Sequence, residues 1–148
     1  MRIFNSATAG LFRIGNAVRA KARSSMSGSA EELAAVARKM APVDEGNLED
    51  AIVVSEAGRG LFGGIKFEVK IDENMPLPEK PGKTVGDYAT IMHEQLTPYG
   101  PLQLGPASIE KQKTTDVIVG GGFLERAADQ VSPSIVRSIH DAIAKVLR

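Results

Sequence analysis

The proline at position 42 restricts the fold of this chain more than any other single residue. Residues 29–41 are rich in good helix formers, and Ser29 followed by Glu32 has the spacing of a capping box. A helix is therefore expected to begin at Ser29. Because proline disfavours helical backbone at the preceding residue, that helix is expected to end just before Pro42.

The residues after Pro42 predict a turn that leads into a strand. Asp44 is able to cap a short new helical turn, and Gly46 permits a positive backbone φ that a side chain would resist. Residues 52–54, Ile-Val-Val, favour a strand. The stretch from 41 to 48 is thus interpreted as a hinge between a helix and a sheet.

Several later segments predict further strands. Residues 65–72 alternate strictly between apolar and polar, as in a half-buried strand, and the glycines before them favour a β-hairpin with residues 51–56. Residues 88–94 suit a strand, although a short helix also fits. Residues 117–119, Val-Ile-Val, are a candidate for one more short strand.

The last segment predicts a long helix from Phe123 to Leu147. Apolar residues recur there at helical spacing and form one stripe. The fold class is therefore predicted as α+β. An antiparallel sheet of three to four strands is expected to carry the helices 29–41 and 123–147 on one face.

The N-terminal segment is predicted to be a separate helical arm. Residues 1–23 have an apolar stripe at helical spacing, and residues 24–28 indicate a bend or break. We divide the chain into this arm, residues 1–28, and one domain, residues 29–148. Before Glu31 the arm has no acidic residue, and its basic residues are Arg2, Arg13, Arg19, Lys21 and Arg23. Two interpretations stand: a helix with a solvated basic face, or an arm that contacts a neighbouring subunit, DNA or an acidic partner.

Residues 95–121 are predicted to be a long irregular loop. They contain many turn formers and few large apolar residues, so we expect the loop to become ordered on contact with a partner. Its candidate interface residues are Pro98, Tyr99, Pro101 and Leu102.

Composition and motif spacing argue against a metal, a cofactor or an enzyme. The chain has no cysteine, and its formal net charge of zero gives no overall electrostatic case for a nucleic-acid partner. His93-Glu94 lacks the second histidine that a zinc-protease motif would place at position 97, which is Thr97. No apolar run is long enough to span a membrane.

Three short blocks resemble a family of phage morphogenesis proteins, the tail-completion or head–tail joining proteins of tailed phages, also called minor capsid or minor tail proteins. The first block is Ala-Pro-Val-Asp, one residue, then Gly-Asn-Leu; the second is Tyr-Ala, three residues, then His-Glu; the third is Gly-Phe-Leu-Glu-Arg-Ala. The residues that carry the resemblance are Pro42, Asp44, Gly46, Asn47, Tyr88, His93, Glu94, Phe123, Leu124 and Glu125. Departures from the family pattern occur at Glu45, Glu49 and Ala51, and they concern surface contacts more than the fold.

The resemblance implies a structural virion protein without enzymatic activity. It implies a homo-oligomeric ring, with six copies expected, in the neck between the head connector and the tail. The implied partners are a head-side connector or adaptor, tail terminator or tube proteins, and DNA that passes through the lumen, with no membrane. The implied location is the virion, after assembly in the host cytoplasm. A small DNA-binding protein that uses the basic N-terminal helix is the alternative.

Overall fold

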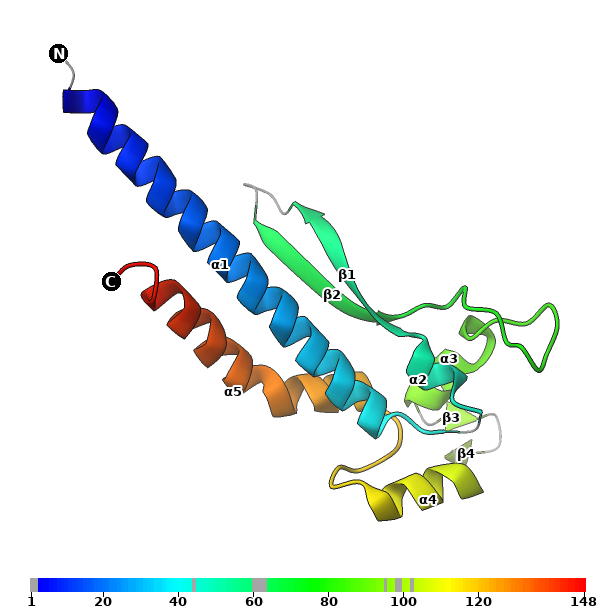
Figure 1. The fold of residues 1–148 in the computed structure, drawn as a ribbon. Helices are drawn as coiled ribbons and strands as arrows, with labels where there is room; N and C mark the ends of the chain where they lie inside the picture. Colours follow the sequence, from blue (N-terminus) through cyan, green and yellow to red (C-terminus); the bar gives the residue numbers. More distant parts are fainter. Residues whose placement is uncertain (1–2, 44, 60–63, 95, 98–99, 102) are drawn as a thin grey trace.

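One long helix runs through the whole molecule, and the other elements are arranged around it (Figure 1). The computed structural model describes residues 3–43, 45–59, 64–94, 96–97, 100–101 and 103–148. Helix α1, Ile3–Met40, has 38 residues. Figure 1 shows helix α5, Phe123–Ala144, on one side of α1 and the hairpin of strands β1 and β2 on the other.

The predicted break at residues 24–28 is wrong, because α1 is continuous through it. Ser29 is not the first residue of a helix but a buried residue in the middle of one. The residues next to Ser29 along α1 are small, which lets α5 approach α1 closely. The Ser25 hydroxyl on α1 and the Ser138 hydroxyl on α5 are 3.0 Å apart and share a hydrogen bond. Tertiary packing here outweighs the weak helix propensity of serine and glycine. Whether residues 1–28 behave as a unit apart from residues 29–148 stays a prediction.

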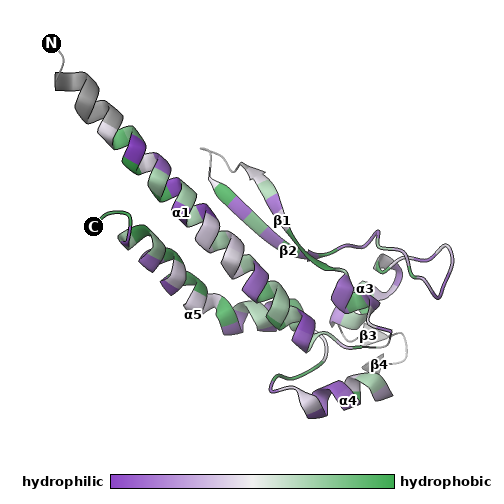
Figure 2. Ribbon diagram, in the orientation of Figure 1, coloured by the Kyte–Doolittle hydropathy of each residue, from purple (hydrophilic) through white to green (hydrophobic). Residues whose placement is uncertain are grey.

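The predicted hairpin is confirmed. Strand β1, Ile52–Arg59, pairs antiparallel with β2, Ile65–Ile71, with Ile52 opposite Ile71 and a register shift between Glu56 and Arg59. Figure 2 shows hydrophobic and hydrophilic residues alternating along β2, as the sequence pattern predicts.

The α+β class is confirmed, but the predicted sheet of three to four strands is wrong. Within the described residues the hairpin forms a sheet of two strands, and β3, Leu96–Thr97, pairs separately with β4, Gly100–Pro101. Helix α1 contacts both β1 and β2, whereas α5 packs mainly against α1. The two helices therefore do not lie side by side on one sheet.

Three segments expected to be strand or loop have a different structure. Residues 86–94 form helix α3, Gly86–Glu94, which is the option that the sequence left open. The predicted loop contains helix α4, Pro106–Thr114, with its proline at the first turn, where no backbone N–H is needed. Residues 117–119 form no strand, because the Gln112 side chain bonds to their backbone instead, at 3.0 Å to the Val117 carbonyl and 2.7 Å to the Val119 amide.

The core lies where the C-terminal half of α1 meets the start of α5, helix α3 and the base of the hairpin. Phe123 and Ile52 are its largest fully buried side chains, with Val85, and Ala34, Ala37 and Ala41 lie against them. The short helix α2, Asn47–Asp50, adds Leu48. With so many alanines, the core depends on close backbone approach rather than on large side chains.

Candidate functional site

The three motif blocks, far apart in the sequence, meet at this core. The Gly120 amide donates to the Met40 carbonyl at 2.9 Å, which joins the end of α1 to the turn before α5. The Gly122 amide donates to the His93 carbonyl at 2.5 Å, and the His93 ring lies edge-on to Phe123 with ring centroids 5.0 Å apart. The resemblance therefore rests on residues that hold one junction together.

The Nε2 atom of the His93 side chain makes no hydrogen bond within the described residues. Its Nε2 lies 3.1 Å from a Glu125 carboxylate oxygen, but the alignment is not that of a hydrogen bond, and within the described structure this buried atom has no other partner. His93 contributes to the fold through the contact of its ring with Phe123 and through its backbone carbonyl, which accepts from the Gly122 amide.

Arg126 holds the turn that leads into α5. Its guanidinium donates to three backbone carbonyls: Gly121 at 3.1 Å, Ile118 at 2.8 Å and Gly120 at 2.9 Å. Gly122 then takes a φ of 61° as the N-cap of α5. The fixed fork of five N–H donors suits arginine to this task.

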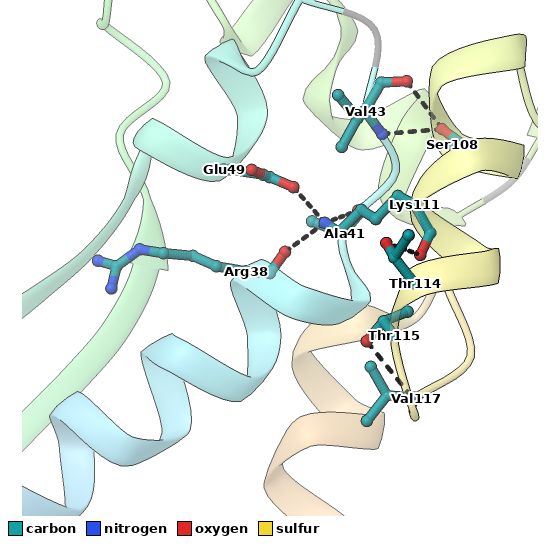
Figure 3. Close-up of polar contacts among 9 residues, drawn as sticks. All are labelled: Arg38, Ala41, Val43, Glu49, Ser108, Lys111, Thr114, Thr115 and Val117. Atoms are coloured by element: carbon teal, nitrogen blue, oxygen red, sulfur yellow. Dashed lines mark hydrogen bonds and ion pairs between the residues drawn. The ribbon is translucent and has the colours of Figure 1, made fainter.

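Lys111 joins helix α4 to the end of α1 and to α2 (Figure 3). Its ammonium donates to the Arg38 carbonyl at 2.6 Å, to the Ala41 carbonyl at 2.7 Å, and to the Glu49 carboxylate. These bonds use all three of its donors. A cation at the C-terminal end of a helix also interacts favourably with the helix dipole, so Lys111 caps α1 from a different helix.

A second contact ties α4 to the hinge. The buried Ser108 hydroxyl accepts from the Val43 amide and donates to the Val43 carbonyl, both at 2.8 Å. The hinge itself has the expected geometry at Gly46, where φ is 85°, and Gly46 occupies the N-cap of α2. Pro42 is buried, and Asn47 bonds to Glu45 at 3.4 Å. Sequence reasoning missed Lys111 and Ser108, since nothing local marks either residue as a partner of the hinge.

The first turns of α1 extend beyond the end of α5 and beyond the hairpin (Figure 1). Here Leu11 is 71% exposed and Phe12 is 69% exposed. Arg23 forms an ion pair with Glu56 on β1, and Lys21 lies beside α5. This stretch, residues 10–23, is called the arm below.

Some predicted residues are not placed by the structure. Those outside the described residues are Arg2, Asp44, Pro98, Tyr99 and Leu102. Glu94 is the last residue of α3, and Pro101 lies in β4. The roles predicted for the interface residues stay predictions.

The described residues offer no metal site and no membrane span. No group of three or more histidine, aspartate or glutamate side chains is arranged to hold an ion in this part of the chain. None of the helices described here combines the length and the hydropathy that crossing a bilayer requires.

Comparison with known proteins gives a match to a family model. Residues 8–89, more than half of the chain, match the family model described as "Bacteriophage HK97-gp10, putative tail-component". No curated protein and no solved structure matches the chain significantly. The matched range includes most of α1, the hinge, the hairpin and the start of α3. The chain therefore belongs to the HK97 gp10-like family of bacteriophage tail components.

Proposed function

We propose that this chain is a non-enzymatic structural protein of the phage neck that assembles into a ring, with six copies expected, around the DNA channel. The ring would join the head-side connector or adaptor to the tail terminator or tube proteins. The protein would assemble in the host cytoplasm and remain in the virion neck.

One observation carries this proposal: the arm presents two adjacent large apolar side chains, Leu11 and Phe12, to solvent. The chain is poor in aromatic residues, so an exposed phenylalanine on a protruding helix is costly unless another molecule covers it. Membership of a tail-component family supports an assembly partner as that molecule.

The test is the mass and the shape of the purified protein. Native mass spectrometry is expected to give a closed oligomer of six copies, and negative-stain images are expected to show rings with a central hole. A protein that stays monomeric at every concentration, and that also fails to bind purified connectors or tails, contradicts the proposal.

The basic residues of the N-terminal segment favour a second candidate, a DNA-binding protein. Five basic residues and no acidic residue occur in the first thirty positions. Fluorescence anisotropy with a labelled duplex at 50 and 200 mM salt tests this candidate. Binding through several phosphate contacts would weaken steeply between these two conditions, whereas a ring protein that only surrounds DNA would bind it feebly at both.

A further inference from the structure

A hollow lies at the end of the molecule opposite the arm. It has a volume of about 540 Å³ and lies between the end of β2, helix α3 and the start of α5. Its apolar lining includes Val69, Ile71 and Leu124, and His93 lies at its wall. A concave apolar surface with a few polar groups is the usual form of a binding site.

The edge of this hollow is acidic. Asp72 and Glu73 line it, and both are exposed. Glu125, with a side chain 71% exposed, adds a third carboxylate beside His93. Lys70 is the basic residue in the lining, so the surroundings carry a net negative charge. The hollow therefore suits a partner that is apolar at its centre and basic around it.

The arm has these properties. Leu11, Phe12 and Arg19 line one shallow depression along α1, so the two apolar side chains and the guanidinium share a face. The first thirty residues carry five basic groups and no acidic group, while the whole chain has equal numbers of both, so the rest of the chain has an acidic excess of five. Charge complementarity of this kind fixes orientation and speeds encounter.

The arm cannot reach the hollow of its own chain. At 1.5 Å per residue, Phe12 lies about 40 Å along α1 from Met40. Met40 is the residue bonded to Gly120, close to the Gly122–His93 contact at the wall of the hollow. Helix α1 is unbroken between the two ends (Figure 1). A contact between arm and hollow must therefore join two molecules.

We propose that the arm of one copy docks in the hollow of the next, with Leu11 and Phe12 against the apolar lining and Arg19 beside the carboxylates. The two surfaces differ, so the contact is head to tail, and such contacts generate closed rings when the rotation between copies closes. This inference rests on the proposed ring, and it names the surfaces that would build the ring.

A charge-swap experiment tests the pairing. Arg19→Glu places a carboxylate at position 19 against the carboxylates of the hollow, and Glu73→Lys places a lysine on the rim against Arg19. Each variant alone is expected to assemble at least about tenfold more weakly than the wild type, measured as the midpoint concentration in mass photometry and light scattering. Mixed in equal amounts, the two variants form complementary contacts in both directions of an alternating ring, and assembly is expected to return.

Two controls isolate the contact. Glu79→Lys makes the same charge change at an exposed loop residue outside the hollow and is expected to assemble like the wild type. The double variant Leu11→Ser and Phe12→Ser removes the apolar contact. It is expected to assemble weakly even when it is mixed with a charge variant. Unchanged melting temperatures show that all variants fold.

The outcomes separate this inference from the ring itself. If the wild type forms rings and both charge variants do so equally well, the arm–hollow contact is wrong and the ring proposal stands. If both variants are weak and mixing restores nothing, Glu73 and Arg19 do not face each other, and the contact is again wrong. If the wild type never assembles and also fails to bind purified connectors or tails, both proposals fail.

Discussion

The two halves of α1 have opposite relations between side-chain size and burial. In the C-terminal half the fully buried residues are small, with Ala34 and Ala37 both 0% exposed. In the N-terminal half the large residues Leu11 and Phe12 are exposed. One continuous helix thus serves two purposes: its small residues bring elements of the same chain together, and its large ones lie where no described element of this chain covers them.

The comparison shows what each half can tolerate. Where α5 and the hairpin approach the helix, alanine leaves no space, so added volume must push neighbouring elements apart. At Leu11 and Phe12, which are largely exposed, a change of side chain should disturb little of the packing within the chain. Substitutions in the C-terminal half of α1 should therefore change the stability of the protein, and substitutions in the N-terminal half should change its assembly.

The largest loss of stability is expected from Ala34→Leu. The added carbons enter a site with no exposed surface, and overpacking should lower the free energy of unfolding by about 3 kcal/mol. Urea denaturation measures it. Ala35→Leu, at an exposed neighbouring position, is the matched control and should change stability by less than about 0.5 kcal/mol. Equal effects at the two positions would show that the buried face of α1 is assigned wrongly.

Lys111→Met should have the next largest effect, a loss of about 2 kcal/mol. The Glu49 carboxylate and the carbonyls of Arg38 and Ala41 would lose their shared cation in a partly buried site. Thermal unfolding at constant pH measures the loss.

The matched control for Lys111→Met is Lys113→Met. Lys113 pairs with Glu110 at the surface with a side chain 65% exposed, and surface pairs of this kind contribute little. If removing either lysine costs the same, α4 does not anchor the C-terminal end of α1.

Gly46→Val should cost about 1–2 kcal/mol, because a β-branched residue strains the backbone at a φ of 85°. Gly28→Val is the control: Gly28 lies inside α1 with open space where a Cβ would be, and valine is not worse than glycine in a helix. An unchanged melting temperature for Gly46→Val would mean that the hinge relaxes to another conformation without loss.

The smallest effect on stability is expected at the arm. In dilute, unassembled protein, the double variant Leu11→Ser and Phe12→Ser should change the free energy of unfolding by less than about 0.5 kcal/mol, since both side chains are already in water. Denaturation at low concentration by circular dichroism measures it. A loss above about 1 kcal/mol would show that the arm packs on its own chain and would remove the contrast between the two halves.

Local patterns were sufficient for the elements whose geometry depends on near neighbours. Strict alternation over residues 65–71 predicted the hairpin strand, and the apolar stripe after Phe123 predicted α5. Gly46 was identified as the position for a positive φ because only glycine adopts it without strain. In each case the information lies within a few residues, where the backbone preferences act.

Other features were decided by contacts between residues distant in the sequence. Serines and a glycine at 24–28 weaken a helix locally, yet α1 continues because α5 packs alongside it. Likewise, residues 117–119 have strand-like composition, but the Gln112 side chain takes their backbone groups and no strand forms.

The junction around Lys111 shows the same division most clearly. Pro42 was sufficient to predict that α1 ends before the hinge, since proline disfavours helical backbone at the preceding residue. The backbone carbonyls at that end have no acceptor bond within the helix, and the side chain of Lys111, about 70 residues later, donates to them. No local sequence pattern distinguishes Lys111 from the other lysines. A helix end leaves acceptors that must be satisfied, but only the packing of α4 against α1 decides which donor reaches them.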